Sequence, residues 1–311
     1  MHRQTIGSAL DAIGNTPVVK LSRVVPAGCA DIYVKHESFN PTGSYKDRFA
    51  RAMIEGAEQR AALRPGMSVV EYSGGSTGSS LAFVCAVKGY PLRVVTSDAF
   101  AREKLRTMEA FGAELIIIPS EGGRITPDLI PSMMEEARRI SAEEGVYWTN
   151  QFENPDLTDG YRGIGDELLA QLDLPIDAFC GGVGTGGMLL GTAASLRDAG
   201  CPARIVALEP GSAPLITKGE RGTHRVEGIG VGFVPPHLTP DTYDEARAID
   251  ETEAREMARR LAREEGVFTG ISSGLNVVGA LQLAQELGPG KTVVTVAVDT
   301  GLKYLAGDLF E

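Results

Sequence analysis

The stretch Asn40-Pro41-Thr42-Gly43-Ser44-Tyr45-Lys46-Asp47-Arg48 is a turn rich in proline and glycine that leads straight into a helical pattern. The turn delivers Lys46 to the first turn of a helix, where its positive charge opposes the helix macrodipole. This field, together with partial desolvation, favours the neutral and nucleophilic amine. Such an amine can form a Schiff base with an aldehyde cofactor, pyridoxal phosphate. The alternative is a solvated lysine that pairs with Asp47 or a later acid.

The composition is that of an ordinary globular protein, with 43% hydrophobic and 23% charged residues among 311. A formal net charge of -11 argues against nucleic-acid binding. No apolar run approaches the ~20 residues that span a bilayer, and Met1–Thr5 are not followed by the apolar core of a signal peptide. The four cysteines form no CxxC and the four histidines show no metal-ligand spacing. We therefore expect a cytoplasmic protein without a metal site or a membrane segment.

Short β-rich runs alternate with helical patterns, which predicts parallel sheets covered by helices in two successive α/β blocks. The first block covers about 40–149, and 210–250 read as long loops near a site. The expected strands are 31–36, 68–72, 92–97, 114–119, 177–180, 204–209 and 292–298, and the expected helices are 47–62, 77–88, 101–111, 127–144, 158–172, 186–199, 254–265 and 274–287.

The glycine-rich run Gly181–Met188 follows a strand and opens a helix. Glycines let backbone N–H groups converge, and the helix N-terminus favours a phosphate. A tight turn without a ligand is the structural alternative. Gly182, Gly184 and Gly187 also form G-x-G-x-x-G, and the next strand ends at Glu209. That outline fits a dinucleotide-binding fold, so an NAD-dependent oxidoreductase is a competing interpretation.

A second Gly/Ser loop, Ser73–Gly78, lies between a strand and a helix of the first block. It can bind an anion, with hydroxyl groups as added donors, or its Ser76 or Thr77 can simply cap the helix. Two anion sites, one in each block, suit a ligand bound between the blocks, with a cofactor phosphate at one site and a substrate carboxylate at the other. The serines of Gly270–Gly274 are either helix caps or contacts to a cofactor ring, and Asp299-Thr300-Gly301 ends an apolar strand where ligands of α/β sheets gather.

With these residues in place, the chain resembles the cysteine synthase (O-acetylserine sulfhydrylase) family, in the tryptophan-synthase-β fold group of pyridoxal-phosphate enzymes. The resemblance runs nearly end to end. The matching segments, in chain order, are Ile13–Pro17, Asn40–Arg48, Gly184–Gly187, Gly228–Phe233 and Gly270–Gly274.

The resemblance implies a fold, a cofactor and a role for each matching position. The fold is α/β, with two three-layer αβα domains, largely parallel sheets and pyridoxal 5'-phosphate in the cleft between them (fold type II). The smaller, mobile substrate-loop domain is 40–149, and 1–39 with 150–311 form the larger phosphate-binding domain. Lys46 holds the cofactor and acts as base and acid. Gly184, Thr185, Gly186 and Gly187 bind the phosphate, and Ser272 meets the pyridine nitrogen. The residues Ser73, Gly74, Gly75, Ser76, Thr77 and Gln151 bind the substrate, and Ser76 also contacts the cofactor.

The chain departs from the family pattern in two places. The usual Thr-Ser-Gly-Asn-Thr-Gly loop reads Ser73-Gly74-Gly75-Ser76-Thr77-Gly78 here, so Ser76 replaces an Asn that contacts both the cofactor's phenolic oxygen and the substrate carboxylate region. Met188 stands where the family usually has Thr. We expect the loop to have more space and to tolerate larger leaving groups such as phosphate.

The resemblance implies β-replacement on an activated serine such as O-acetylserine, with sulfide or another small nucleophile, in a homodimeric cytoplasmic enzyme. Cystathionine β-synthase-type chemistry and β-elimination without a second substrate remain alternatives within the class. The NAD-dependent oxidoreductase with Gly182–Gly187 and Glu209, and a catalytically weak binding protein on the same fold, remain alternatives of other classes.

Overall fold

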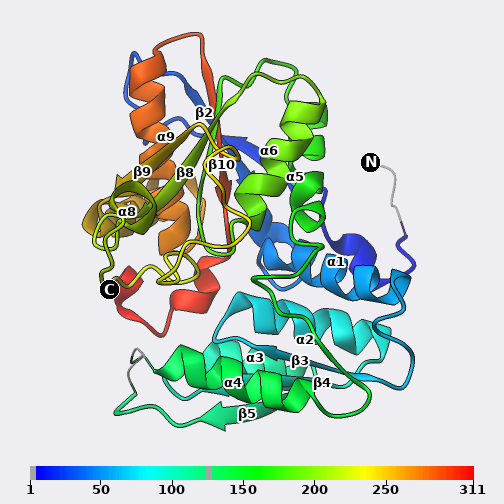
Figure 1. Cartoon of the computed structure of the whole chain (residues 1–311). Coiled ribbons are helices and arrows are strands. Elements are labelled where there is room, and N and C mark those ends of the chain that lie inside the picture. The colour runs from blue at the N-terminus through cyan, green and yellow to red at the C-terminus, as the bar shows by residue number, and fades with distance from the viewer. Residues whose placement is uncertain (1–4, 124–125, 127) are drawn as a thin grey trace. The chain divides into compact units, whose positions relative to one another are not determined.

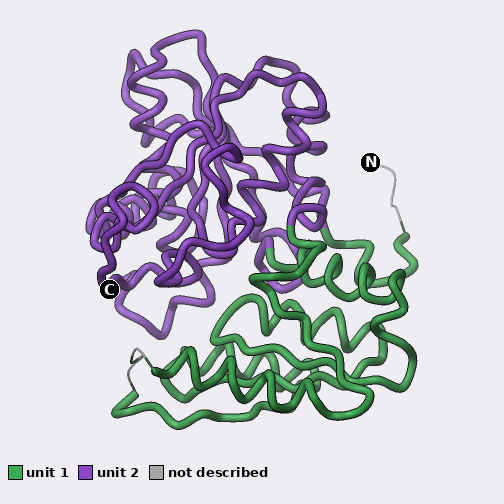
Figure 2. Tube along the Cα trace, viewed as in Figure 1, with its two compact units in different colours: residues 1–13, 46–157 green, residues 14–45, 158–311 purple. Residues whose placement is uncertain are grey.

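A computed structural model describes residues 5–123, 126 and 128–311 of the chain. The described chain forms two compact units (Figure 2). Unit 1 contains the described parts of Met1–Ile13 and Lys46–Leu157, and unit 2 contains Gly14–Tyr45 and Thr158–Glu311. The chain therefore passes from unit 2 into unit 1 between Tyr45 and Lys46.

Unit 2 is built on a six-stranded sheet with the order β1-β2-β10-β7-β8-β9. β1 pairs antiparallel with β2, and all other neighbouring strands are parallel (Figure 1). The central strand β10 is buried along its whole length, as expected of a parallel strand covered on both faces. The strands are β1 (Val18–Lys20), β2 (Asp31–His36), β7 (Ala178–Gly182), β8 (Arg204–Pro210), β9 (Glu245–Ile249) and β10 (Thr292–Ala297).

Helices cover both faces of this sheet. α5 (Asp159–Gln171) and α6 (Gly187–Asp198) lie on one side, and α8 (Glu251–Arg260) and α9 (Ile271–Leu287) lie on the other (Figure 1). Leu275 and Val278 of α9 pack with Ile32 and Val293 of the strands in one apolar core. The short helical segments of unit 2 are η2 (Glu37–Phe39), α7 (Leu215–Lys218), η3 (Leu261–Glu265), η4 (Gly301–Tyr304) and η5 (Asp308–Phe310).

Unit 1 contains a four-stranded parallel sheet with the order β5-β4-β3-β6. Val70 and Tyr72 of β3 pack with Met133 and Ala137 of α4 in one apolar core. Because side chains alternate along a strand, Glu71 belongs to the opposite face of the sheet. The elements are η1 (Ala9–Ala12), α1 (Lys46–Gln59), β3 (Ser68–Tyr72), α2 (Ser76–Lys88), β4 (Leu92–Ser97), α3 (Arg102–Ala110), β5 (Glu114–Ile118), α4 (Leu129–Ser141) and β6 (Val146–Trp148).

The expected strands and helices all form, and most of their ends lie within a few residues of the expected positions. α8 begins three residues early because Asp250 Oδ1 accepts hydrogen bonds from Thr252 N at 2.8 Å and Glu253 N at 3.0 Å. The sequence reading of 210–250 as loop is wrong for α7 and β9, and it also missed β1 and β6. The expected helix start at residue 127 lies outside the described residues, as do residues 1–4 at the start of the chain.

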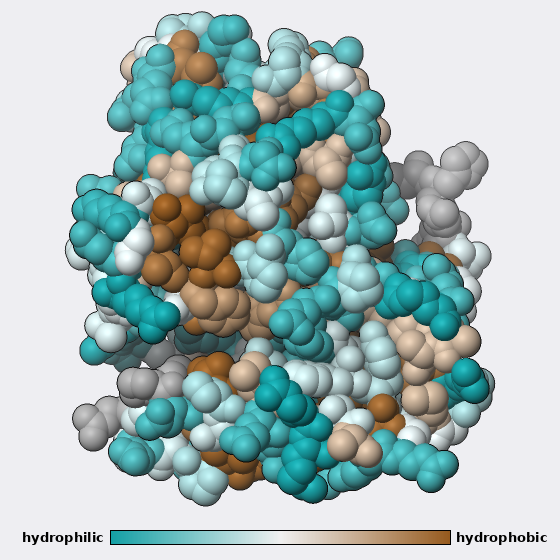
Figure 3. Space-filling model, viewed as in Figure 1, coloured by the Kyte–Doolittle hydropathy of each residue, from teal (hydrophilic) through white to brown (hydrophobic). Residues whose placement is uncertain are grey.

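The described residues contain no helix that is long and apolar enough to cross a membrane. Among the same residues, no group of His, Cys, Asp and Glu side chains is arranged to hold a metal ion. All four cysteines are free thiols. Hydrophobic residues gather on part of unit 2 in the space-filling view, whereas much of the remaining face is hydrophilic (Figure 3). Large apolar side chains exposed in this unit are Phe39, Leu169, Phe233, Val234, Leu302 and Leu305.

Candidate functional site

The turn that precedes Lys46 is fastened to the carboxyl end of β10. Tyr45 N donates a hydrogen bond to Val298 O at 3.1 Å, and Thr300 N donates to Gly43 O at 2.9 Å. Gly43 has a φ of 72°, and a Cβ there would lie 2.6 Å from Thr300 Cγ2. Glycine therefore satisfies both a left-handed backbone and a close approach at this point. α1 begins three residues after Gly43, at Lys46, whose side chain is buried.

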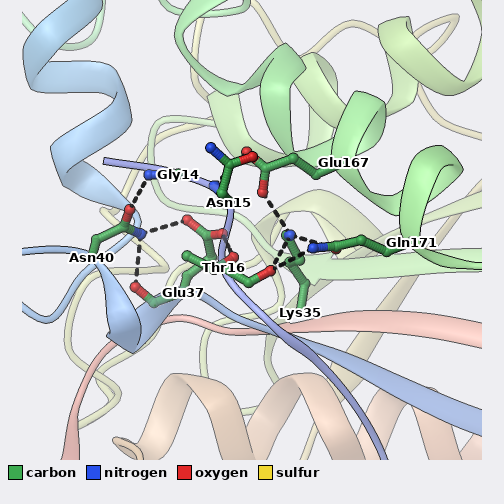
Figure 4. Close-up of polar contacts among 8 residues, drawn as sticks. All are labelled: Gly14, Asn15, Thr16, Lys35, Glu37, Asn40, Glu167 and Gln171. Carbon is green, nitrogen blue, oxygen red and sulfur yellow. Dashed lines mark hydrogen bonds and ion pairs between the residues drawn. The ribbon is translucent and has the colours of Figure 1, made fainter. Parts of the chain in front are cut away.

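Asn40 holds the start of this turn through both ends of its side-chain amide (Figure 4). Its Oδ1 accepts a hydrogen bond from Gly14 N at 2.8 Å, and its Nδ2 donates to Glu37 Oε2 at 2.8 Å. The other oxygen of this carboxylate, Oε1, accepts from Thr16 Oγ1 at 2.7 Å. Glu37 is fully buried. It therefore joins the Gly14–Thr16 segment to the turn before Lys46, and both segments were singled out in the sequence.

Lys35 is a second buried lysine, and its surroundings make it structural. Its Nζ forms an ion pair with Glu167 Oε2 at 2.6 Å and donates to Gln171 Oε1 at 2.8 Å and to Thr16 O at 2.6 Å (Figure 4). These contacts use the three donors of an ammonium group. Lys35 thus ties β2 to α5, and its Nζ is not available as a competing nucleophile.

The loop between β7 and α6 has the geometry of an anion-binding site. Gly186 is the N-cap of α6 with a left-handed φ of 84°. A Cβ at Gly184 would overlap the carbonyl oxygen of Gly228, and Gly230 N donates to Val183 O at 3.0 Å. The 228–230 segment therefore lies against the loop, so that backbone rather than side chains faces a ligand there. The N–H groups at the start of α6 favour an anion, and these residues fit the phosphate of pyridoxal phosphate.

The remaining residues of this loop are placed as follows. Thr185 is buried, and its Oγ1 accepts a long hydrogen bond of 3.4 Å from Gly187 N, the first residue of α6. Met188, which replaces the usual Thr, is also buried and packs against Gly181, where a Cβ would overlap its Cε. The methionine therefore fills the core beneath the loop.

α9 begins at Ile271 on the same edge of the sheet. Ser272 and Ser273 are both buried in its first turn, and Ser273 Oγ accepts a hydrogen bond from Val298 N at 2.9 Å. The N-terminus of α9 is thereby held at the end of β10. Ser272 consequently lies in the part of unit 2 that also holds Tyr45, the residue before Lys46, because both Ser273 and Tyr45 bond to Val298.

Asn276, one turn further along α9, joins the two central strands. Its Oδ1 accepts a hydrogen bond from Gly182 N at 2.7 Å, and its Nδ2 donates to Val296 O at 2.9 Å. Asn276 is fully buried. It satisfies the last N–H of β7 just before the phosphate loop. The 40–45 turn, the 183–187 loop and the start of α9 therefore meet at the carboxyl ends of β10 and β7, the usual ligand edge of a parallel sheet.

Unit 1 holds the second loop singled out in the sequence. Ser73 Oγ accepts hydrogen bonds from Gly75 N at 3.2 Å and Gly78 N at 3.1 Å. α2 begins at Ser76, so the loop leads into a helix N-terminus that favours a carboxylate. Thr77 Oγ1 donates to Gln151 Oε1 at 2.9 Å. The structure thus brings Gln151 to the loop, although the two are far apart in the chain.

Glu71 is a buried carboxyl group beneath this loop. Its Oε2 accepts hydrogen bonds from Thr149 Oγ1 at 2.5 Å and Gln151 N at 3.1 Å, and its Oε1 accepts from Tyr72 N at 2.9 Å. Burial raises the pKa of Glu71 from its ordinary value of 4.5 to about 7, although these hydrogen bonds act in the opposite direction. Glu71 therefore fixes the backbone that carries Gln151.

Glu209 does not have the surroundings that a dinucleotide site needs. Its carboxylate accepts hydrogen bonds from Ile216 N at 2.7 Å, Thr217 N at 2.8 Å and Thr217 Oγ1 at 2.7 Å. The side chain is buried and serves as a cap for α7. A ribose hydroxyl would have to displace these bonds, so the geometry does not support the NAD-dependent alternative.

A model of the family described as pyridoxal-phosphate dependent enzyme matches residues 9–299. The chain belongs to this family. The cysteine synthase of Staphylococcus aureus (strain Mu50 / ATCC 700699) is 41% identical over 312 residues, which cover 100% of this chain and 99% of the relative. Both the resemblance seen in the sequence and the pyridoxal-phosphate cofactor are therefore confirmed.

Solved structures of the same fold extend over the whole chain. An O-ureido-L-serine synthase matches with a TM-score of 0.90 and 37% identity, covering 99% of this chain and 96% of its own. A cysteine synthase from Entamoeba histolytica matches with a TM-score of 0.92 and 31% identity, covering 100% and 92%. An O-acetylserine dependent cystathionine β-synthase from Helicobacter pylori matches with a TM-score of 0.90 and 31% identity, covering 99% and 100%. The chain is thus an α/β enzyme of fold type II.

Three residues that shape the site were missed by the sequence reading: Glu37, Glu71 and Asn276. Glu37 and Glu71 are charged residues that a sequence alone places on the surface. Asn276 lies between apolar residues of α9, and an amide in such a place is a signal of a buried hydrogen-bonding role.

We expect Glu71 to make the protein less stable as the pH rises. Because the folded pKa of Glu71 is raised above 4.5, its stabilisation is complete below that value and is lost as the pH rises through about 7. Between about pH 5 and about pH 8, the free energy of unfolding in urea should fall by about 2 kcal/mol more in the wild-type protein than in Glu71→Gln. An equal pH dependence of the two proteins would mean that Glu71 does not take up the proton.

We expect Asn276→Ala to destabilise unit 2 and to loosen the phosphate loop. The change leaves Gly182 N and Val296 O buried without these partners, which costs about 2–4 kcal/mol in the free energy of unfolding. Gln285→Ala, an exposed position on the same helix, is the matched control and should change little. The measurements are urea unfolding and the rate of cofactor loss on dilution. A loss no larger than that of the control would contradict the role of Asn276.

Proposed function

We propose that this enzyme catalyses β-replacement on an activated serine, with O-acetylserine or a similar ester as one substrate and sulfide or another small nucleophile as the other. The observation that carries the proposal is the turn before Lys46, which is hydrogen-bonded to the end of β10 beside the N-terminus of α9. The full-length likeness to proteins named cysteine synthase supports it.

Bound pyridoxal phosphate supplies an electron sink for the bond changes at the amino acid's Cα and Cβ. We assign Lys46 to hold the cofactor through Nζ and then to take and return the proton at Cα. The backbone of Gly184, Thr185, Gly186 and Gly187 binds the phosphate at the start of α6. The hydroxyl of Ser272 would bind at the pyridine nitrogen of the cofactor. Because a neutral hydroxyl stabilises a protonated nitrogen less than a carboxylate would, the site favours prompt elimination of the β-group.

The amino-acid substrate is held, in this proposal, by the loop in unit 1. The substrate's α-carboxylate binds at the N-terminus of α2, with Ser73, Gly74, Gly75, Ser76 and Thr77 around it. Gln151 orients this loop, since its Oε1 already accepts a hydrogen bond from Thr77 Oγ1. Ser76 also takes the place of the residue that meets the cofactor in the family pattern.

In this proposal residues 40–149 serve as the mobile substrate-loop domain, and 1–39 with 150–311 serve as the phosphate-binding domain. The two compact units divide the chain at other points, because Gly14–Tyr45 belong to unit 2 and Lys46–Leu157 to unit 1. The enzyme is a homodimer in the cytoplasm, a compartment that suits its four free thiols. A cystathionine β-synthase-type reaction is the second candidate within the class, supported by the Helicobacter pylori relative of that name. A β-eliminating lyase reaction on the same scaffold is the third.

We expect Lys46→Ala to abolish turnover and covalent retention of the cofactor while the protein stays folded. Alanine has no amine to form the bond or to move the Cα proton. Borohydride reduction followed by peptide mapping should place the cofactor on the peptide that contains Lys46 in the wild-type enzyme, and on no peptide in the variant. Lys88→Ala, which removes a lysine paired with Glu58 on the same unit, is the control and should keep the label.

Labelling of any other lysine in the wild-type enzyme, or turnover by Lys46→Ala at a comparable rate, would remove Lys46 from the proposed role. Circular dichroism of the variant separates loss of chemistry from loss of fold.

We expect the enzyme to convert O-acetylserine and sulfide to cysteine. Replacing sulfide with homocysteine distinguishes the second candidate by formation of cystathionine, and omitting the nucleophile distinguishes the lyase by formation of pyruvate. Product analysis by mass spectrometry decides among the three. No product from O-acetylserine, O-phosphoserine or serine under any of these conditions would contradict β-replacement on activated serines.

A further inference from the structure

The ring of Phe100 fills the space that the sequence reading assigned to the ligand at Gly74. The φ of Gly74 is not left-handed, so its backbone does not require glycine. A Cβ built at this position would instead overlap three atoms of the Phe100 ring. Any residue larger than glycine must therefore displace the ring. Glycine is needed at position 74 because an aromatic side chain lies on it.

Gly75, the next residue, provides the contrast. A Cβ at Gly75 would meet nothing within 4 Å, and its φ of -151° is not left-handed. The loop therefore has open space on one of its two adjacent glycines and an aromatic wall on the other. Position 75 is glycine in the usual loop as well, so its open space is not a gain over that loop. At position 74, where glycine replaces the usual serine, the Phe100 ring takes up the expected space.

Both the backbone and the side chain of Phe100 are held in place. In the turn after β4, Phe100 N donates to Ser97 O at 3.3 Å and Ala99 N donates to Ser97 Oγ at 3.2 Å. Asp98 Oδ1 accepts from Ser120 N at 2.8 Å, which ties this turn to the segment after β5. The Phe100 side chain is half-buried and packs against the apolar core that α4 forms with β3 and β4. Moving the ring costs part of this packing.

The hydrogen-bond donors of the loop are also partly committed. Ser73 Oγ accepts the N–H groups of Gly75 and Gly78, and the Thr77 hydroxyl donates to Gln151. The N-terminus of α2 suits one carboxylate. A second, doubly charged anion beside the ring would lose water without gaining these donors. The face of an aromatic ring is electronegative and disfavours an anion further, whereas a methyl group packs well on it.

We propose that Phe100 is a specificity-determining residue, an apolar wall on the substrate loop that favours a small neutral β-substituent such as acetate over phosphate. This inference rests on the proposed function and names the substrate class within it. It reverses the expectation that phosphate is tolerated, because that expectation assumed empty space at Gly74.

Selectivity is tested with the holoenzyme, O-acetylserine and O-phosphoserine at saturating sulfide. The ratio of kcat/KM for acetate over phosphate ester should fall about tenfold in Phe100→Ala and stay near the wild-type value in Phe100→Leu, which keeps an apolar side chain. The change should lie in KM for the amino acid, with KM for sulfide unchanged. A purely structural role for Phe100 would lower both kcat/KM values together and leave their ratio unaltered, which overturns the proposal.

The contact itself is tested without turnover, by thermal unfolding of Gly74→Ala in the wild-type and Phe100→Ala backgrounds. The loss of melting temperature should be large with the ring present and at least halved without it, because the two residues are in direct contact. Gly75→Ala is the matched control and should unfold near the wild-type temperature in both backgrounds. If the losses of melting temperature in Gly74→Ala and Phe100→Ala are additive, or if Gly75→Ala loses as much as Gly74→Ala, the contact between Gly74 and Phe100 is contradicted.

The proposed function and the selectivity assigned to Phe100 are contradicted by different results. If the wild-type enzyme converts neither ester, the proposed function falls and the selectivity falls with it, whatever the unfolding data show. If it converts O-acetylserine but prefers O-phosphoserine, or if the effects of the Gly74 and Phe100 substitutions are additive, the specificity role of Phe100 is wrong and the proposed function stands.

Discussion

The hydrogen bond from Asn40 to the buried carboxylate of Glu37 is the constraint on which the arrangement around the site depends. Turns at the ends of parallel strands have backbone groups that no neighbouring strand satisfies. Asn40 accepts the N–H of Gly14 with the other end of its amide, so one side chain holds two irregular segments in register. The turn then reaches β10 at Tyr45, and Lys46 follows as the first residue of α1.

The same device recurs where other irregular segments must be held. Glu71 accepts hydrogen bonds around Gln151, and Glu209 accepts two N–H groups at the start of α7. A carboxylate has about four lone-pair sites, so one buried side chain can fix several backbone groups at once. Each such bond to a charged group is worth about 1.5–3 kcal/mol, and burial of the charge opposes it. At Glu71 burial outweighs the bonds, and its pKa is raised to about 7.

Local patterns were enough to predict most of the fold and the identity of the cofactor. The Pro/Gly turn before Lys46 and the glycines before α6 act within a few residues, so their consequences are visible in the chain. β9 was not predicted because Glu245–Ile249 mixes charged and small residues and has no apolar run. The buried roles of Glu37 and Glu71 were not predicted, because each accepts a hydrogen bond from a threonine in another part of the chain. Only the folded structure brings these donors to the buried acids.

The glycines of the two ligand loops show why the substrate site was harder to read than the cofactor site. Gly186 is required by a left-handed backbone, and Gly184 by the approach of the Gly228 carbonyl. Gly74 is required by a ring that arrives from the turn after β4, and Gly75 by neither cause. All four are the same letter in the sequence. Whether a glycine leaves room for a ligand is decided by what packs on it, and at Gly74 that is a side chain 26 positions further along the chain.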